Sequence, residues 1–447
     1  KSRFDYDQKT LYKMIWEYVQ KNRKNMETQL RRLGFSLDWT RNKFTLDEDI
    51  VKIVYKTFKK LYDDGLVYRG DRLVNYCTRC GTSFSDLEVN HKEQKDPLYY
   101  IKYGPFVLAT VRPETKFGDT AVAVNPKDKR YKEWIGKEVE VQGVIGKYRV
   151  GVIADEMIDP NFGTGVAKVT PAHDMKDFEI GLRHNLKRVQ VIGLNGKLNE
   201  KTGKYKGLYV KQARKIIAED MRKMGLIEKI DENYTHTIEV CYKCGTTIEP
   251  MLLPQWFIKM RLLAKPAIDA VKKGKIKIFP KRFEKIYFQF LENIKDWNIS
   301  RQIVWGIRIP AWKCIRCHPD RAKRVEGSLS TAAVAGDSST PLRFAQNDKR
   351  GEWIVTDGIK PEKCPNCGSK DLEQDADTFD TWFSSSQWPF VTLMSSSSSK
   401  FNPSTSSGLT SSSLSLRAEG LSGVERVKVQ SSKLEKGVSD YDYFYPT

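Results

Sequence analysis

The sequence predicts an α/β protein in which a compact β-rich module interrupts a mixed α/β framework. Three observations indicate this fold class. A helical stretch opens the chain, short runs of strand type fill residues 99–236, and all eight cysteines form Cys-x-x-Cys pairs. With 447 residues, the chain is long enough for two or three domains with separate cores.

The N-terminal part is expected to be helical. In "TLDEDIVKIVYKTFKKLYDDG", Thr45 and Glu48 have the spacing of a capping box. Gly65 can end the helix, because glycine adopts left-handed backbone angles without steric penalty. The apolar residues between them share one helical face and are Ile50, Ile53, Val54, Phe58 and Leu61.

Residues 99–236 change to short β-type runs separated by glycine, which predicts a compact β-rich insert with few helices. The runs are "LYYIKY", "FVLATV", "TAVAVN", "VEVQGVIG" and "RVQVIGL".

The cysteines predict two tetrahedral all-thiolate zinc sites, each built from two pairs. A glycine follows the second cysteine of three pairs, as in a zinc knuckle. Disulfides would need an oxidising compartment, and "CIRCH" matches a haem attachment signature but has a partner pair downstream. The expected ligands are Cys77, Cys80, Cys241, Cys244, Cys314, Cys317, Cys364 and Cys367.

The first two pairs lie just outside the two ends of the insert. If Cys77, Cys80, Cys241 and Cys244 share one ion, that ion clamps the stalk from which the insert emerges.

The net charge of +20 favours a polyanionic partner, with nucleic acid as the first candidate. A lysine-rich, solvated surface explains the charge equally well. No apolar run approaches the length of about 18 residues that spans a membrane, and the first residues do not form a signal peptide. We therefore expect a cytoplasmic protein without a membrane partner.

Two serine-rich stretches, 324–350 and 394–423, lack large apolar residues and periodicity. We expect both to be disordered insertions, with a functional disordered arm as the alternative.

The insert carries the candidate chemistry. In "VTPAHDMKDF", Asp174 and Asp177 lie one turn apart on one face of a helix that Pro171 can lead into. Asp174 could instead only cap that helix, or the two aspartates could bind a metal with His173. Arg112 and Lys168 suit a phosphate or a developing oxyanion. Because no positioned serine or cysteine nucleophile is visible, any hydrolysis would use water.

Five motifs together resemble valyl-tRNA synthetases, which are class I aminoacyl-tRNA synthetases. They are "TVRPET", "FGTGVAKVTPAHDMKDFE", "PQWFIKM", "KDWNISRQIVWGIRIPAW" and "FDTWFSSSQWPF". The resemblance covers about residues 25–393 and the final "DYFYPT", apart from the serine-rich stretches.

The resemblance implies that the insert is a β-barrel-like editing domain, which hydrolyses threonine wrongly attached to the valine tRNA. Asp177 and Asp174 would hold the misattached amino acid together with Lys168 or Thr170. The residues expected around the terminal adenosine and the amino acid are Arg112, Thr110, Thr115, Phe162 and His173, with Phe162 stacking on the base. Trp305 and Trp382 would line the valine pocket.

The same resemblance implies a Rossmann-type catalytic domain that uses ATP and Mg²⁺, with tRNA, valine and threonine as further partners, in a monomer. The expected segments are a helical part of the catalytic domain at 1–74, a zinc-bearing linker at 75–98, the editing domain at 99–236, a return linker and catalytic domain at 237–311, a zinc knuckle at 312–370 with a serine-rich insertion at about 324–350, catalytic domain at 371–393, a serine-rich disordered insertion at 394–438, and resumed catalytic domain at 439–447.

The two ATP-binding signatures of class I synthetases, His-Ile-Gly-His and Lys-Met-Ser-Lys-Ser, do not occur in these 447 residues. We therefore expect an internal fragment that deacylates threonyl-tRNA but forms no valyl-adenylate. The alternatives are a free-standing editing hydrolase, a relative of leucyl- or isoleucyl-tRNA synthetase, and a non-catalytic zinc-ribbon RNA-binding protein.

Overall fold

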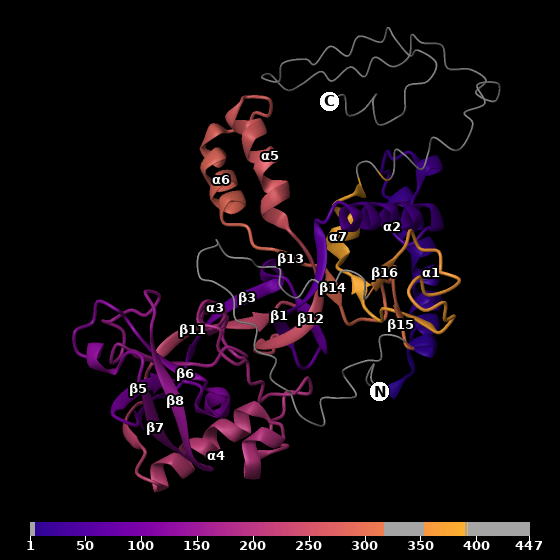
Figure 1. Ribbon diagram of the computed structural model, residues 1–447. Coiled ribbons are helices and arrows are strands. Elements are labelled where there is room, and N and C mark those ends of the chain that lie inside the picture. Colours follow the sequence, from indigo (N-terminus) through magenta and orange to yellow (C-terminus); the bar gives the residue numbers. More distant parts are fainter. Residues whose placement is uncertain (1–4, 317–352, 389–390, 392–447) are drawn as a thin grey trace, which may run out of the picture. The chain divides into compact units, whose positions relative to one another are not determined.

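The computed structural model describes residues 5–316, 353–388 and 391 (Figure 1). Contacts divide the chain into two compact units, one made of residues 1–59, 356–359 and 381–447, the other of 60–355 and 360–380. Both serine-rich stretches lie outside the described residues. Within the described residues, no helix is long and apolar enough to cross a membrane.

The first unit is helical. It contains α1 (Gln8–Arg32), the short helix η2 (Trp39–Arg41), most of α2 (Glu48–Asp63) and α7 (Thr381–Ser385). The predicted face of α2 is confirmed, because Ile50, Val54 and Phe58 are buried. Gly65, with φ of +72°, follows the last turn as expected. The predicted capping box is wrong, because the helix begins at Glu48 and the residue directly before it is Asp47 and not Thr45.

The framework of the second unit is an antiparallel sheet with the order β13-β12-β1-β2. Its long central pair, β1 (Val67–Cys77) and β12 (Glu249–Ile258), is flanked by β2 (Thr82–Phe84) and β13 (Trp297–Asn298). The described ladders of the framework are antiparallel, so the parallel Rossmann-type sheet stays a prediction.

A two-stranded ribbon joins the framework to the insert. The strand β3 (Val89–Lys95) enters the insert and β11 (Thr235–Cys241) leaves it, and the two pair antiparallel along their whole length (Figure 1). Most of their side chains are exposed. The chain therefore enters and leaves the insert at neighbouring points.

The insert is built from two sheets that share one apolar core. One sheet has the order β10-β4-β5 and the other the order β7-β8-β6-β9. The predicted barrel-like form is met only in part, because no ladder joins the two sheets in the described residues. The strands are β4 (Leu98–Tyr103), β5 (Phe106–Thr110), β6 (Ala121–Val124), β7 (Glu138–Gly143), β8 (Gly146–Ala154), β9 (Val166–Val169) and β10 (Ile227–Asp231).

Two helices complete the insert. The strand β6 is buried on both faces: Val122 and Val124 join the core that includes residues of α4 (Val210–Lys223), whereas Ala121 and Ala123 pack toward α3 (Met175–Arg183). The layers place the start of α3 beside the end of β9, which is where the candidate site forms.

Four predicted runs form strands, but "RVQVIGL" does not. Its backbone groups bond elsewhere, because Val191 donates its N–H to His173 and accepts from Asn199. Only an isolated bridge, Ile192 with Leu198, forms there. A hydrophobic run thus becomes a buried loop when side chains satisfy its backbone.

The remaining elements of the described residues are α5 (Met260–Lys272), α6 (Glu284–Glu292), β14 (Ser300–Arg301), β15 (Ala311–Cys314), β16 (Trp353–Val355), β17 (Leu372–Gln374), β18 (Thr378–Phe379), η3 (Asp86–Glu88), η4 (Pro113–Gly118), η5 (Lys132–Trp134), η6 (Glu200–Tyr205) and η7 (Lys281–Phe283).

Candidate active site in the β-rich insert

The turn between β9 and α3 carries the candidate site. Asp174 is the N-cap of α3, and its carboxylate accepts the backbone N–H groups of Lys176 and Asp177. The helix therefore starts where the sequence predicts, and the cap fixes the orientation of its first turn. Asp174 is exposed, whereas Asp177 is only partly exposed.

Thr170 is the centre of the cluster. Its backbone N–H donates to Asp177 Oδ2 at 2.8 Å, and Lys168 Nζ donates to its Oγ1 at 2.7 Å. Thr170 itself is fully buried. One buried residue thus holds both an ammonium and a carboxylate, and the three predicted residues Lys168, Thr170 and Asp177 are brought together.

The two aspartates have different environments. Burial raises the pKa of Asp177 to about 7, against the opposing effect of the Lys168 charge, and the neighbouring Asp174 adds to the increase. A carboxylate that titrates near neutrality and faces a lysine suits an acid–base or cation-binding role. Asp174 has the role of a helix cap.

Asp119 is a member of this cluster that the sequence interpretation missed. Thr170 Oγ1 donates to Asp119 Oδ1 at 2.6 Å, and Tyr103 donates its hydroxyl to Oδ2 at 3.0 Å. The buried ammonium of Lys116 lies 3.5 Å from the same Oδ2, and burial lowers its pKa to about 8. The only sequence signal is an aspartate between η4 and the buried strand β6.

Arg112 belongs to a second charged cluster. Its guanidinium contacts Glu114 at 3.1 Å and Glu249 of β12 at 2.5 Å, and Arg214 of α4 makes a further pair with Glu114 at 2.9 Å. Burial favours protonation of Glu114, but Arg214 and Arg112 hold its pKa below the ordinary value. These ion pairs engage Arg112 with protein carboxylates.

Thr110 and Thr115 fix the same turn. The hydroxyl of Thr110 accepts the backbone N–H of Arg112, and the hydroxyl of Thr115 donates to the carbonyl of Arg112. Both threonines are buried, so their contacts shape the backbone of the "TVRPET" segment.

His173 is a core residue. It is 2% exposed, and its Nε2 accepts the backbone N–H of Val191 at 2.8 Å. Burial, together with the Arg112 and Lys168 charges, lowers its pKa to about 3, so the ring is neutral. Since Nε2 is engaged, that nitrogen is not available for the metal site that His173 and the two aspartates suggested.

The remaining predicted residues lie elsewhere. Phe162 is 58% exposed on the loop between β8 and β9. Trp382 of α7 is also exposed and belongs to the first unit, whereas Trp305 is a partly exposed residue of the second unit. The role of both tryptophans as walls of a valine pocket stays a prediction.

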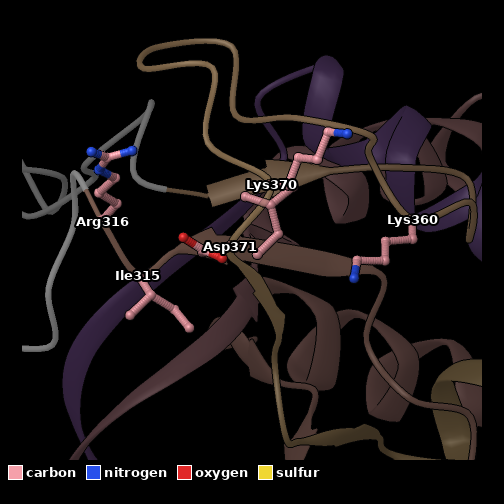
Figure 2. Close-up of a pocket in the computed structure, with 6 residues that line it drawn as sticks. Ile315, Arg316, Lys360, Lys370 and Asp371 are labelled. Carbon is pink, nitrogen blue, oxygen red and sulfur yellow. The ribbon is translucent and has the colours of Figure 1, made fainter.

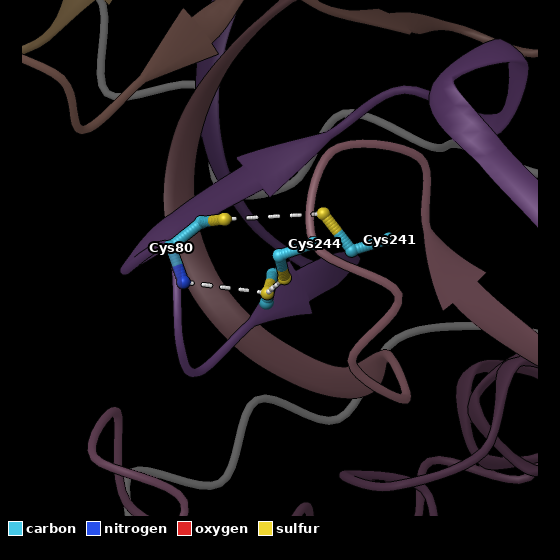
Figure 3. Close-up of side chains that lie close together, drawn as sticks. Cys80, Cys241 and Cys244 are labelled. Carbon is cyan, nitrogen blue, oxygen red and sulfur yellow. Dashed lines mark hydrogen bonds between the residues drawn. The ribbon is translucent and has the colours of Figure 1, made fainter.

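The first cysteine cluster fits a tetrahedral metal ion. The Sγ atoms of Cys77, Cys80, Cys241 and Cys244 lie within 4.8 Å of one another, with Cys77–Cys244 at 3.5 Å and Cys80–Cys241 at 3.9 Å. A Zn–S bond of about 2.3 Å gives sulfur–sulfur edges of about 3.8 Å. Figure 3 shows Cys80 facing Cys241 and Cys244 from the opposite loop.

The second cluster contains Cys314, Cys364 and Cys367, whereas Cys317 lies outside the described residues. The three Cys-x-x-Cys-Gly segments have the same turn: Gly81, Gly245 and Gly368 have positive φ, and each donates its N–H to the backbone carbonyl of the first cysteine of its pair. This confirms the predicted role of the glycine.

A cavity of about 580 Å³ lies beside the second cluster and not at the insert site. Its lining includes Arg316 at one end and Lys360 at the other, with Lys370 and Asp371 between them (Figure 2). The basic lining agrees with the positive net charge of the chain.

Comparison with known proteins identifies the family. Residues 1–409 match the family described as tRNA synthetases class I (I, L, M and V). The chain is 45% identical to a valine–tRNA ligase of Petrotoga mobilis over 88% of its length and 41% of that relative. It is 44% identical to the valine–tRNA ligase of Thermotoga maritima over 88% of its length and 42% of that relative. It is also 44% identical to the valine–tRNA ligase of Clostridium acetobutylicum, over 85% of its length and 40% of that relative.

The chain thus spans about two fifths of the length of these curated relatives. A solved leucyl-tRNA synthetase complex from Agrobacterium radiobacter K84 aligns with 86% of this chain and with 49% of its own chain, at 17% identity and a TM-score of 0.30. The family match covers most of the sequence, including the insert and the cysteine pairs, and the chain belongs to the class I tRNA synthetases of the I, L, M and V group.

Proposed function

We propose that the chain is part of a valine–tRNA ligase and that its insert hydrolyses threonine wrongly attached to the valine tRNA. The observation that carries the editing proposal is the Lys168–Thr170–Asp177 cluster, in which a buried threonine holds an ammonium and a carboxylate. The names of the relatives carry the ligase proposal.

The ligase activity would attach valine to its tRNA with ATP and Mg²⁺, as in the relatives. The charge of +20 and the basic lining formed by Arg316, Lys360 and Lys370 favour tRNA as the polyanionic partner. Trp305 and Trp382 remain our candidates for the valine pocket.

Threonine and valine explain why a second site is needed. The two side chains have nearly the same shape, and an apolar pocket cannot strongly exclude an added hydroxyl. A polar site can instead require that hydroxyl, because valine would leave its buried polar groups without partners. Lys168 and Asp177, which both contact Thr170, are charged and partly buried, which suits that requirement.

In this proposal, Asp177 accepts the α-ammonium of the misattached threonine and a Lys168 N–H contacts its hydroxyl or the ester oxygen. Water attacks the ester carbonyl: its oxygen bonds to the carbonyl carbon, the bond to the ribose oxygen breaks, and a proton of the water passes to the released ribose hydroxyl. The hydroxyl of Thr170 is already engaged by Lys168 and Asp119. Asp174 contributes by holding the first turn of α3 in place. Phe162, which is exposed, offers a stacking face for the terminal adenine.

We also propose two structural zinc sites. The first uses Cys77, Cys80, Cys241 and Cys244 and would fasten the base of the β3–β11 ribbon. The second uses Cys314, Cys364 and Cys367 with Cys317. Metal analysis of the purified chain should give about two zinc ions per molecule. Cys241→Ser should lower this content to about one, and an unchanged content would remove the first site.

The editing proposal is tested by incubating the purified chain with valine tRNA that carries either threonine or valine. We expect release of threonine and little release of valine. Equal hydrolysis of both esters would refute the proposal. Tight tRNA binding without turnover would instead favour a non-catalytic RNA-binding protein.

A further inference from the structure

We propose that Asp119 is a positioning residue of the candidate editing site, which acts through Thr170 to hold Lys168 and Asp177 in one arrangement. This inference rests on the proposed editing function and deepens it. Asp119 lies seven residues after Arg112 and is separated from Thr170 by 51 positions in the sequence.

The direction of the hydrogen bonds supports this role. A carboxylate only accepts and an ammonium only donates. Thr170 Oγ1 therefore gives its single proton to Asp119 and accepts a proton from Lys168, at 2.6 and 2.7 Å. The threonine hydroxyl is thus fully oriented by two charged neighbours, and the Lys168 ammonium keeps two further N–H groups.

Burial separates the residues that position Lys168 and Asp177 from the residues that a ligand can contact. Thr170 is 0% exposed, and the side chain of Asp119 is also fully buried, whereas the side chain of Lys168 remains 13% exposed. Asp119 and Thr170 therefore cannot touch a ligand in this arrangement. They can act on one only through Lys168 and Asp177.

The backbone is built for this contact. Gly118 precedes Asp119, and a Cβ at Gly118 would lie 2.6 Å from the Val189 carbonyl and 3.1 Å from Thr170 Cγ2. A side chain at this position would collide with the Val189 carbonyl and crowd Thr170, so glycine is required for the segment to lie here. The second oxygen of Asp119 is held by Tyr103 and faces Lys116, so the carboxylate cannot turn away.

Asp119 is also the shared counter-ion of two lysines. Lys116 Nζ lies 3.5 Å from Oδ2, and Lys168 Nζ lies 3.9 Å from Oδ1. Without this carboxylate, the two ammonium groups would repel each other, and Lys168 would lose both its counter-charge and its oriented threonine partner.

The test measures kcat and KM of the 447-residue chain for deacylation of threonine and valine esters of the valine tRNA. Asp119→Asn should lower kcat for the threonine ester roughly 10- to 100-fold with a smaller change in KM, as expected for loss of positioning. Thr170→Val keeps the N–H that holds Asp177 but lacks the hydroxyl, so it should resemble Asp119→Asn. Thr170→Ser keeps both groups and should restore most of the activity.

The double variant gives the sharpest readout. Because Asp119 and Thr170 act through one link, Asp119→Asn/Thr170→Val should lose no more activity than the more damaged single variant. The pH profile adds a second readout. The negative charges of Asp119 and Asp174 raise the pKa of Asp177, whereas the Lys168 charge and the hydrogen bond from the Thr170 N–H lower it. The acidic limb of Asp119→Asn should therefore move to lower pH.

Two controls separate positioning from folding. Tyr148→Phe removes a hydroxyl of a half-buried tyrosine that donates to Tyr103 and makes no hydrogen bond to Asp119, and it should leave kcat close to that of the wild type. If Asp119→Asn does not fold, the double variant Lys116→Met/Asp119→Asn takes its place in every assay. This double variant also removes the Lys116 ammonium, which would otherwise be buried without its counter-ion.

The outcomes are distinct. If the wild type spares valine but Asp119→Asn behaves like Tyr148→Phe, the positioning role is refuted while the editing function stands. Additive losses in the double variant would also refute it. If the wild type does not prefer the threonine ester, the proposed function itself fails.

Discussion

Two charged clusters lie close to His173, one within the insert and one shared between the insert and β12, and they differ in how completely their charges are paired. In the Arg112 cluster, two arginines and two carboxylates pair with one another. In the Lys168 cluster, an ammonium and a carboxylate are each held by one threonine. Both clusters contribute to the low pKa of His173.

This difference in ion pairing shows that the type of a residue does not indicate whether its charge is available to bind a ligand. Arg112 and Lys168 both suit an anionic ligand, but the Arg112 guanidinium is already bound to Glu114 and Glu249. Removing one partner of a saturated, buried ion pair is destabilising because a buried charge is left alone. Charges with unused donors or acceptors can instead bind a ligand. Four experiments can break or sharpen this comparison.

The largest effect is expected for Arg112→Met. This variant leaves the buried Glu249 without its partner, which should lower the free energy of unfolding by about 3–5 kcal/mol. Urea denaturation followed by circular dichroism measures the loss. Arg112→Met/Glu249→Met should recover much of it, because the pair is then removed together.

A different outcome for Arg112→Met would contradict the conclusion that only the Lys168 cluster is available to a ligand. If Arg112→Met keeps its stability and loses deacylation through KM, then Arg112 contacts the ligand directly, as the family resemblance implies.

Asp177→Asn is expected to have the next largest effect. Loss of the carboxylate should reduce deacylation of the threonine ester by about 100-fold. Burial raises the pKa of Asp177 from 3.8 to about 7, so folding favours its neutral form. The free energy of unfolding therefore falls as the pH rises from about 4 to about 7 and stays lowered above that range. The Asn variant should therefore be at least as stable as the wild type at pH 8.

Glu179→Gln provides the matched control, because Glu179 is exposed on the same helix. It should change neither rate nor stability. Retained deacylation in Asp177→Asn would remove the ligand role of this carboxylate.

The pH dependence should report the same group. Asp177 must be ionised to accept an ammonium and titrates at about 7, so deacylation should fall about tenfold per pH unit below that value. The measurement is the enzyme-catalysed rate between pH 5 and 8 after subtraction of spontaneous ester hydrolysis. Asp174→Asn should move this limb to lower pH, because the Asp174 charge helps to raise the pKa of Asp177.

A rate that stays constant between pH 5 and 8 would show that Asp177 does not control the reaction.

The smallest effect is expected for Asp174→Ala. Loss of the N-cap should cost about 1 kcal/mol of unfolding free energy, with only a modest loss of deacylation. Thermal melting and the deacylation rate measure the two quantities. A loss of rate larger than that of Asp177→Asn would exchange the roles of the two aspartates.

Local patterns allowed much of the insert to be predicted. Strand runs such as "LYYIKY" and the glycine of each knuckle depend on neighbouring residues, and the structure has them as expected. The start of α3 and the closeness of Lys168, Thr170 and Asp177 also follow from short spacings. Sequence periodicity contains this information directly.

Contacts between distant residues could not be predicted in this way. Asp119 reaches Thr170 across 51 positions, and Arg112 reaches Glu249 across 137. The loop at Val191 depends on His173, which is 18 positions away. Each depends on how the sheets pack, so the sequence revealed residues that suit a site but not which of them are already paired.

The paired strands β3 and β11 have a consequence for the history of such proteins. Because Lys95 at the end of β3 lies opposite Thr235 at the start of β11, the 139 residues between them could be gained or lost in one genetic event without moving either end of the host. A short turn from β3 to β11 would suffice to close the gap. This geometry makes the inserted module a portable part, which other hosts could acquire by simple recombination.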